Sequence, residues 1–204
     1  MIKTDRLLID ELKIEDVYDM FKWKRNRDLL IKEYDFLDAS DGDPELWYDY
    51  RMNYPRLKSY AVRSISENKT IGFISIRNIN RIFKSAILGI TFDENYLGMG
   101  YGTEALVGFL DYYFNTMNMK TMLLDVGKYN FRALKCYRKL GFEVKREYKV
   151  VVPKQFKDMK HELIKDPAQA ENRTYILLAD LFILVYYRMK LKNVYFNRIQ
   201  NNCG

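Results

Sequence analysis

With 204 residues, the chain is long enough for one ordinary domain with a full hydrophobic core. Its 48% apolar and 30% charged residues are typical of a globular protein and exclude the disordered and collagen-like classes. The net charge of +7 would suit an anionic partner, such as a nucleic acid, a membrane surface or a phosphate-rich cofactor, although a solvated Lys/Arg surface gives the same balance.

The first fifty residues predict a strand followed by two helices. Residues 6–12 (RLLIDEL) alternate apolar and polar side chains imperfectly, as a strand does, and the next stretch places Val17, Met20 and Phe21 on one helical face. Residues 33–50 hold seven acidic residues and no Lys or Arg. Within this acidic block, Asp43-Pro44 is typical of a helix start.

The middle of the chain predicts three strands, a glycine loop and a long helix. The strands are residues 59–65, 70–79 and 85–92, and the first two are joined by a turn at 66–69. The glycine loop follows the third strand, and from Gly102 to Met117 apolar residues recur at helical spacing. The next elements are a strand over 120–126, a helix capped by Asn130 and ended by Gly141, and a strand over 142–152.

The C-terminal quarter is predicted to be less regular. Residues 153–173 are polar, the stretch from Tyr175 is apolar enough to return to the core, and 197–204 are typical of a loose tail. We therefore expect one domain over residues 1–190, an unusual insertion over 153–174 before the last strand, and a C-terminal tail over 191–204. The insertion could serve as a lid, a dimer contact or a wall of an acceptor site.

The glycine loop has the features of a phosphate site. Gly98, Gly100 and Gly102 alternate between a strand and a helix, and the first N–H groups of a helix lack intrahelical partners and carry positive potential. A tight connection without any ligand would give the same pattern. The sequence lacks the Gly-Lys-Ser/Thr of a P-loop, and a dinucleotide fingerprint would need glycine at Thr103, although Asp125 stands where a ribose-binding acid would be.

Two segments resemble the GNAT superfamily of N-acetyltransferases. LGMGYGTEAL (97–106) resembles the family's first signature, and NFRALKCYRKLGF (130–142) resembles its second, in the same order along the chain. The opening residues are similar to the branch that contains ribosomal-protein and spermidine acetyltransferases. The resemblance implies an α+β, three-layer fold: a mixed, mostly antiparallel central sheet flanked by helices, splayed between its fourth and fifth strands.

The resemblance also implies acetyl-CoA as the acetyl donor, with no metal. The pyrophosphate would rest on N–H groups from Gly98 to Thr103, and the pantetheine arm would pair with residues 90–92 where a bulge splays the sheet. Arg132 and Lys135 are candidates for the 3′-phosphate. The implied cofactor-binding residues are Ile90, Thr91, Phe92, Leu97, Gly98, Met99, Gly100, Tyr101, Gly102, Thr103, Asn130, Arg132, Ala133 and Tyr137.

Acetyl transfer to an amine needs a neutral nucleophile and a protonated leaving group. Tyr137 matches the family position that protonates the leaving thiolate. Many relatives carry a glutamate base where Ile87 stands here, and their Arg or Gln before the glycines is Leu97. We expect Glu33 or Asp35 in the acidic block to attract a cationic amine, with Glu33 as a candidate base; a plain solvated loop is the alternative.

The resulting expectation is an N-acetyltransferase that moves the acetyl group directly to a primary amine: a peptide N-terminus, a polyamine or another small amine. The alternative is a non-catalytic acyl-CoA sensor or interaction module. Nucleic-acid binding rests on the pI alone, so neither a nucleic acid nor a membrane is expected as a partner, whereas a homodimer is conceivable. Two cysteines and a charged opening predict a cytoplasmic location, and a single histidine argues against Ser-His-Asp chemistry.

Overall fold

The computed structural model describes residues 1–24, 42–152, 164–178 and 181–202. Glu33, Asp35 and His161 lie outside these described residues. In chain order the elements are β1 (Ile2–Lys3), β2 (Leu7–Glu11), α1 (Ile14–Met20), α2 (Pro44–Asn53), β3 (Lys58–Ser64), β4 (Lys69–Asn80), β5 (Ser85–Phe92), the 3₁₀ turn η2 (Glu94–Tyr96), α3 (Tyr101–Asp111), the π-helical turn η3 (Tyr112–Thr116), β6 (Thr121–Gly127), α4 (Phe131–Lys139), β7 (Glu143–Val151), α6 (Pro167–Glu171), β8 (Tyr175–Leu178), β9 (Leu181–Lys192) and α7 (Asn193–Asn202).

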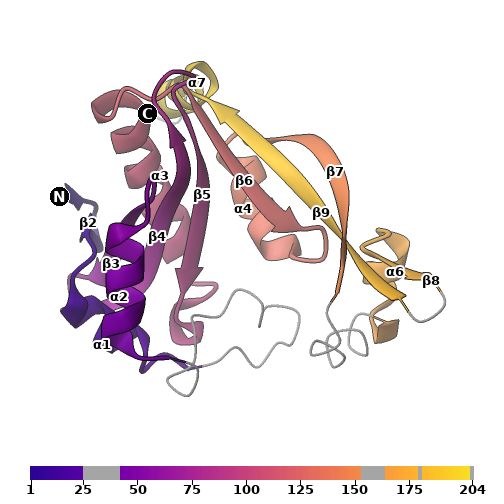
Figure 1. The fold of residues 1–204 in the computed structure, drawn as a ribbon. Coiled ribbons are helices and arrows are strands. Elements are labelled where there is room, and N and C mark those ends of the chain that lie inside the picture. Colours follow the sequence, from indigo (N-terminus) through magenta and orange to yellow (C-terminus); the bar gives the residue numbers. More distant parts are fainter. Residues whose placement is uncertain (25–41, 153–163, 179–180, 203–204) are drawn as a thin grey trace.

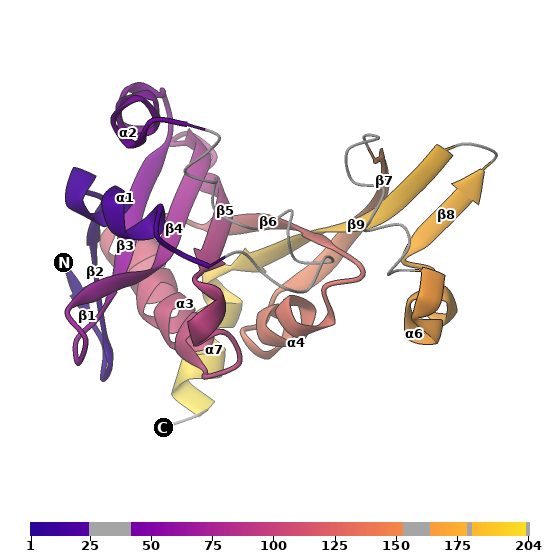
Figure 2. The same cartoon turned by 90° about the horizontal axis from the view of Figure 1, so that it is seen from below.

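The strands of the described residues form one nine-stranded sheet in the order β1-β2-β3-β4-β5-β6-β9-β7, with β8 paired to β9. Only the β5–β6 pair is parallel; the other pairs are antiparallel. Helices α1 and α2 cover one face, and α3, α4 and α7 lie on the other (Figures 1 and 2). The predicted three-layer fold with a mixed, mostly antiparallel sheet is therefore confirmed.

The sheet splays between β5 and β6, as predicted. The two strands pair from Ser85↔Thr121 to Leu88↔Leu124 and then separate, although β5 continues to Phe92 and β6 to Gly127. Figure 1 shows them diverging like the arms of a V. The expected bulge at this point is wrong: β5 keeps its register with β4 from Ile87 to Phe92, and the shift lies between Arg77 and Asn80.

Local signals place α1 and α2 on their face of the sheet. Asp43 caps α2 by accepting hydrogen bonds from the N–H groups of Glu45 (2.8 Å) and Leu46 (3.2 Å). Asp16 of α1 is buried, but it accepts hydrogen bonds from the Arg63 guanidinium and from the Thr70 hydroxyl (2.6 Å). Because a buried carboxylate is stable only when paired, these bonds fix α1 against β3 and β4.

The main core lies between the sheet and α3. Helix α3 buries its apolar stripe, and the helix continues for one π-helical turn that buries Tyr113 and Phe114. The rings of Phe109 and Tyr60 meet edge to face at 5.0 Å, and the Tyr113 hydroxyl donates to the Thr121 carbonyl at 2.7 Å. These contacts hold α3 against the splayed strands, so the glycine loop at its start is anchored on a rigid element.

The C-terminal end differs from the prediction. The apolar stretch from Tyr175 forms a hairpin of two strands, β8 and β9, and β9 extends to Lys192. The loose tail is also wrong, because residues 193–202 form α7 and bury Phe196 against Phe114, with ring centroids 5.5 Å apart. None of the helices within the described ranges is long and apolar enough to cross a membrane.

Candidate active site

A cavity of about 320 Å³ opens between the start of α3, helix α4 and the diverging ends of β5 and β6. It lies at the splay, on the sheet face covered by α3 and α4. Its lining residues are Ile90, Thr91, Phe92, Tyr96, Leu97, Gly98, Gly100, Gly102, Thr103, Leu106, Val126, Asn130, Arg132, Ala133, Lys135, Cys136, Tyr137 and Lys139. The size and the mixed apolar and cationic lining suit an elongated anionic ligand.

The glycine loop presents backbone donors to this cavity. Gly98 and Gly100 have φ of 80° and 85°, a region that side-chain-bearing residues rarely adopt. Helix α3 begins after Gly100 without a side-chain cap. Within the described part of the chain, the N–H groups of residues 98–103 have no hydrogen-bond acceptor. Unpaired donors at a helix start form an anion-binding site.

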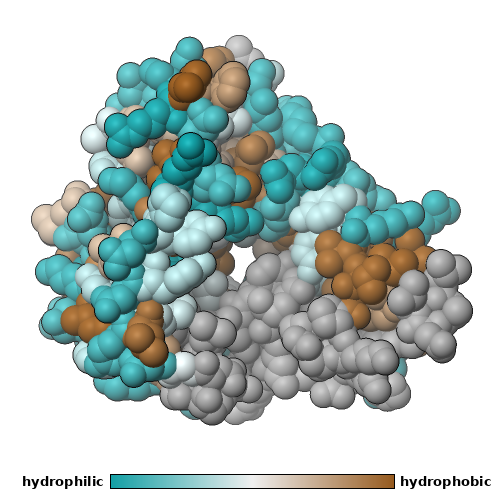
Figure 3. Space-filling model, viewed as in Figure 1, coloured by the Kyte–Doolittle hydropathy of each residue, from teal (hydrophilic) through white to brown (hydrophobic). Residues whose placement is uncertain are grey.

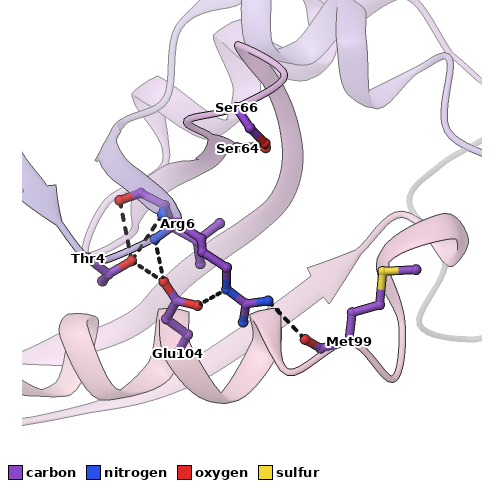
Figure 4. Close-up of polar contacts among 7 residues, drawn as sticks. Thr4, Arg6, Ser64, Ser66, Met99 and Glu104 are labelled. Atoms are coloured by element: carbon purple, nitrogen blue, oxygen red, sulfur yellow. Dashed lines mark hydrogen bonds and ion pairs between the residues drawn. The ribbon is translucent and has the colours of Figure 1, made fainter.

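Arg6, from the connection between β1 and β2, holds the glycine loop in place (Figure 4). Its Nε donates to Glu104 Oε2 at 2.6 Å and its Nη1 donates to the Met99 carbonyl at 3.1 Å. The guanidinium also stacks on the Tyr101 ring at 4.2 Å. Fixing the Met99 carbonyl orients the following peptide, so this contact sets the direction of the Gly100 N–H.

Glu104 links Thr4 and Arg6 to helix α3. It accepts hydrogen bonds from the Thr4 hydroxyl (2.6 Å) and the Arg6 backbone N–H (2.8 Å). Burial alone would raise the pKa of Glu104, but the hydrogen bonds from Thr4 and Arg6 outweigh it and hold the pKa below its usual value. The residue is therefore an anion at neutral pH and a stable partner for Arg6.

Helix α4 forms the opposite wall. The Asn130 side chain caps it by accepting from the Ala133 N–H at 3.1 Å, as predicted, and the Cys136 thiol lies 3.3 Å from the Thr103 hydroxyl of α3. Two further cations, Lys135 and Lys139, join Arg132 along the cavity. Cations beside the donors at the start of α3 give the cavity a positive potential.

Tyr137 brings a titratable group to this wall. Its ring packs against Phe142 with centroids 5.8 Å apart, and its hydroxyl makes no hydrogen bond among the described residues. Burial raises the pKa of Tyr137 above its usual value, so the hydroxyl carries its proton throughout the neutral range. The hydroxyl therefore holds a proton that no described residue accepts in a hydrogen bond.

The structure gathers most of the predicted cofactor-binding residues around this one cavity. Met99 and Tyr101 do not line it: the Met99 side chain is exposed, and the Tyr101 ring lies under Arg6. Sequence reasoning missed Tyr96, Leu106, Val126, Cys136 and Lys139 as lining residues, and it missed Arg6 altogether. No sequence pattern marks these residues except the helical spacing that places Cys136 and Lys139 beside Arg132.

The other predicted groups have different positions. Ile87 is buried and offers no base, and Asp125 binds Arg188 rather than projecting into the cavity. Glu33 and Asp35 belong to the segment outside the described residues. Within the described ranges no three His, Cys, Asp or Glu side chains are grouped in a way that could hold a metal ion.

Comparison with known proteins finds acetyltransferases both among protein families and among single proteins. The family described as acetyltransferase (GNAT) domain matches residues 6–143. A spermidine N(1)-acetyltransferase of Escherichia coli (strain K12) is 33% identical over 112 residues, which is 55% of this chain and 56% of that protein. The match thus spans only about half the length of this curated relative.

Solved structures show the same fold. A spermidine N-acetyltransferase from Vibrio cholerae, in complex with CoA and spermine, matches with a TM-score of 0.68 over 95% of this chain and 99% of that one, at 18% identity. A dodecameric structure of spermidine N-acetyltransferase from the same organism matches with a TM-score of 0.64 over 96% of this chain and 99% of that one, at 18% identity.

Proposed function

The chain belongs to the acetyltransferase (GNAT) domain family, and we propose that it transfers the acetyl group of acetyl-CoA directly to a primary amine. The observation that carries this proposal is the row of unpaired N–H groups at residues 98–103, which shares one cavity with Tyr137. N–H groups that can donate hydrogen bonds to a diphosphate lie in the same cavity as a phenol that can donate a proton. This combination fits the binding and cleavage of a CoA thioester better than it fits a strand-to-helix connection without a ligand.

Each part of acetyl-CoA has a complementary part of the cavity. The pyrophosphate would accept hydrogen bonds from the glycine loop, and the 3′-phosphate would lie near Arg132, Lys135 and Lys139. The amide groups of the pantetheine arm would pair with β5 beyond Leu88, where β6 no longer does. This arrangement would direct the thioester into the V of the splay, towards Tyr137.

The reaction then needs one bond made and one broken. The amine nitrogen attacks the thioester carbonyl, the C–N bond forms, and the C–S bond breaks with its electron pair on sulfur. Tyr137 gives its proton to the thiolate, and the amine proton leaves through water because Ile87 supplies no base. A leaving thiol with a pKa of about 8.5 would need this help only partly, so Tyr137 accelerates the step rather than enabling it.

The acceptor class is a small primary amine, and the named substrates of the relatives make a polyamine the first compound to test. The absence of a base at Ile87 and of Arg or Gln at Leu97 favours one other function, a non-catalytic acyl-CoA sensor. The two functions differ in one observable, because a sensor would bind CoA without consuming an acceptor.

Thiol release from acetyl-CoA, measured against a panel of amines, tests the proposal. We expect CoA release that depends on both the enzyme and an amine, with one acetylated amine formed for each thiol. Tight CoA binding without amine-dependent release across polyamines, peptide N-termini and amino acids would overturn the enzyme and leave the sensor.

Two further predictions concern assembly and location. A homodimer would be formed most readily through the apolar surface at the far end of β7, β8 and β9, where Val150, Val151 and Leu177 are exposed (Figure 3). The dodecameric relative makes an oligomer a reasonable expectation.

The few cysteines favour a cytoplasmic location.

A further inference from the structure

The sheet face opposite the cavity carries a second group of polar residues at the point of the V. Side chains alternate along a strand, and Val126 lines the cavity, so Asp125 faces the side on which α1 and α2 lie. Asp125 is also the first residue of β6 beyond the stretch paired with β5. Asp125 therefore lies beside the gap between β5 and β6, through which an acceptor on this face would reach a thioester bound in the cavity.

Among the residues that the structure describes, this position carries more positive than negative charge. Arg188 donates from both Nε and Nη2 to the Asp125 carboxylate, the latter at 2.7 Å, which neutralises that charge. Arg77 on β4 reaches across β5, but its Nη2 stops 3.6 Å from Asp125 Oδ2 and its side chain is 46% exposed. One carboxylate therefore stands against two guanidinium groups, and the Arg77 fork remains open.

Arg51 of α2 adds a third guanidinium. It is half-buried between the rings of Trp47 (5.0 Å) and Phe73 (4.9 Å), and its Nε reaches only the Ser59 hydroxyl at 3.4 Å. In the described part of the chain no carboxylate pairs with it. Burial, together with the charge of Arg77, lowers the pKa of Arg51. Two neighbouring cations, of which only Arg77 approaches a carboxylate and that carboxylate is already bonded to Arg188, are costly, and an anionic ligand would relieve this cost.

Small residues occupy the strand positions next to these cations. Ser59 and Ser75 are directly opposite on β3 and β4, and Ser75 is opposite Gly89 on β5. A Cβ at residue 89 would lie 2.8 Å from Ser75 Oγ, so only glycine leaves this space open. Ser75 is almost buried, and its hydroxyl has no partner among the described residues. The Ser75 hydroxyl beside Gly89 is thus a hydrogen-bonding group on the strand that also carries Arg77, opposite the serine that Arg51 contacts.

We propose that Arg51, Arg77 and Ser75 bind a carboxylate carried by the acceptor, so that the acceptor is an amino-acid-like amine. A planar guanidinium fork binds a carboxylate through two hydrogen bonds, and it can bind a phosphate in the same way, so the acceptors compared below include both anions. The inference rests on the proposed acetyl transfer, since it names the acceptor for that same site. It also departs from the polyamine relatives, because the arginines that the described residues place here would repel a polycation.

The same charges would help the chemistry. A nearby cation disfavours protonation of an amine and so lowers its pKa, which increases the fraction of reactive neutral amine. Electrostatic activation of this kind would partly replace the base that Ile87 cannot supply. The carboxylate would supply the attraction that the amine itself lacks in this environment.

Acceptors of matched length test the inference. The kcat/KM values for β-alanine and γ-aminobutyrate would be compared with those for n-propylamine, O-phosphoethanolamine and spermidine. We expect a carboxylated amine to be preferred over n-propylamine by about 10- to 100-fold, the range for a hydrogen bond to a charged group. A preference for spermidine or n-propylamine overturns the inference while leaving acetyl transfer intact, and a preference for O-phosphoethanolamine overturns the carboxylate assignment.

Variants connect this preference to the arginines. We expect Arg77→Gln to reduce the ratio of kcat/KM for β-alanine to that for n-propylamine by about 10-fold or more. Arg77→Lys keeps the charge but loses the planar fork, so its ratio should lie between those of the wild type and Arg77→Gln. Arg138→Gln, on the exposed side of α4, is the matched control and should keep the wild-type ratio. An unchanged ratio in Arg77→Gln would contradict the proposal.

A binding measurement separates this inference from the proposed function. N-acetyl-β-alanine would be titrated calorimetrically into CoA-saturated protein, in the wild type and in the Arg77→Gln and Arg51→Gln variants. We expect binding to the wild type that both variants weaken by about 10-fold or more. Arg-dependent binding without any turnover would support the anion subsite and reject the transferase, whereas no binding at millimolar concentration would overturn the subsite.

Discussion

At the scale of single residues, Tyr137 is the side chain through which the proposed cofactor cavity would take part in the proposed reaction. Its hydroxyl has no described hydrogen-bond partner, and burial raises its pKa, so the protonated form is the form available to a leaving thiolate. The other lining residues with a thiol or phenol have a partner, because the Tyr96 hydroxyl donates to Glu67 and the Cys136 thiol lies 3.3 Å from the Thr103 hydroxyl. Tyr137 is therefore the described residue of this cavity best suited to general-acid catalysis.

Replacing Tyr137 tests this role. In Tyr137→Phe the ring still packs against Phe142, while the proton donor is lost. We expect kcat to fall by roughly 10- to 10⁴-fold, with little change in the KM for acetyl-CoA, because a general acid acts mainly in the transition state. Steady-state kinetics measure both. A wild-type kcat in a folded Tyr137→Phe variant would remove the residue from the mechanism.

The raised pKa of Tyr137 also predicts the pH dependence. A tyrosine whose pKa lies above the usual value of about 10 does not ionise below that pH, so no activity should be lost on this account between pH 7 and 10. Deprotonation of the amine makes kcat/KM for the acceptor rise over the same interval. A pH–rate profile checks both statements. A fall in kcat that begins near pH 8 would argue against a protonated Tyr137.

Residues whose roles follow from local patterns could be predicted from the sequence. Gly98, Gly100 and Asn130 occupy positions that a helix start itself defines, so neighbouring residues reveal them. Arg6 and Arg77 could not be predicted, because their partners Glu104 and Asp125 are distant in sequence and meet them only after the sheet has formed. A charged residue in a strand carries no local sign of which residue it will meet.

At the scale of elements, the glycine loop depends on a strand connection that is remote in sequence. Arg6 and Thr4 bind Glu104, and Arg6 also binds the Met99 carbonyl, so the loop is fixed from the N-terminal edge of the sheet (Figure 4). Preorganised donors bind an anion more tightly than mobile donors, because no ordering is required on binding. We therefore expect contacts outside the cavity to contribute to the affinity for acetyl-CoA.

Removal of these contacts should affect binding more than chemistry. We expect Arg6→Ala and Glu104→Gln each to raise the KM for acetyl-CoA by about 10-fold, a loss on the order of 1–2 kcal/mol, with a smaller change in kcat. Arg138→Ala, on the exposed side of α4, serves as a control for general loss of positive charge. Equal KM values for the variants and the control would contradict a positioning role.

Elements with strong periodicity matched their predictions closely. Helix α3, the strand pair β3–β4 and the capped helix α4 were all expected, because each has a clear hydrophobic period and a specific turn or cap residue. The hairpin β8–β9 was not expected, since its strands are almost uniformly apolar and lack a period. The π-helical turn after α3 has no sequence signal either.

At the scale of the whole molecule, the C-terminal helix completes the core. The polar composition of residues 197–204 suggested a loose tail, but a single apolar residue, Phe196, is buried against Phe114 and secures α7. Composition alone could not reveal this contact, because one buried aromatic side chain among polar residues does not create a period. The helix lies on the same side of the sheet as α3 and α4 (Figure 2).

Truncation of this side chain predicts a global effect. Phe196→Ala should lower the free energy of unfolding by about 3–5 kcal/mol, as for other buried phenylalanines. Val194→Ala is a matched control on the same helix, since Val194 is largely exposed and should change stability by only about 0.5 kcal/mol. Urea denaturation measures both variants. Equal midpoints would show that α7 does not contribute to the core.

The fold as a whole places the start of α3 and the unpaired end of β5 beside the gap between β5 and β6. The most direct test is calorimetric titration of the wild-type protein with CoA, dephospho-CoA and pantetheine. We predict CoA binding in the micromolar range and a loss of only a few fold for dephospho-CoA, because Arg132 and Lys135 are exposed. Pantetheine, which lacks the diphosphate together with the adenosine, should bind at least about 100-fold more weakly than dephospho-CoA. Equal affinity for CoA and pantetheine, or no heat with CoA, would contradict diphosphate binding by the amides of residues 98–103.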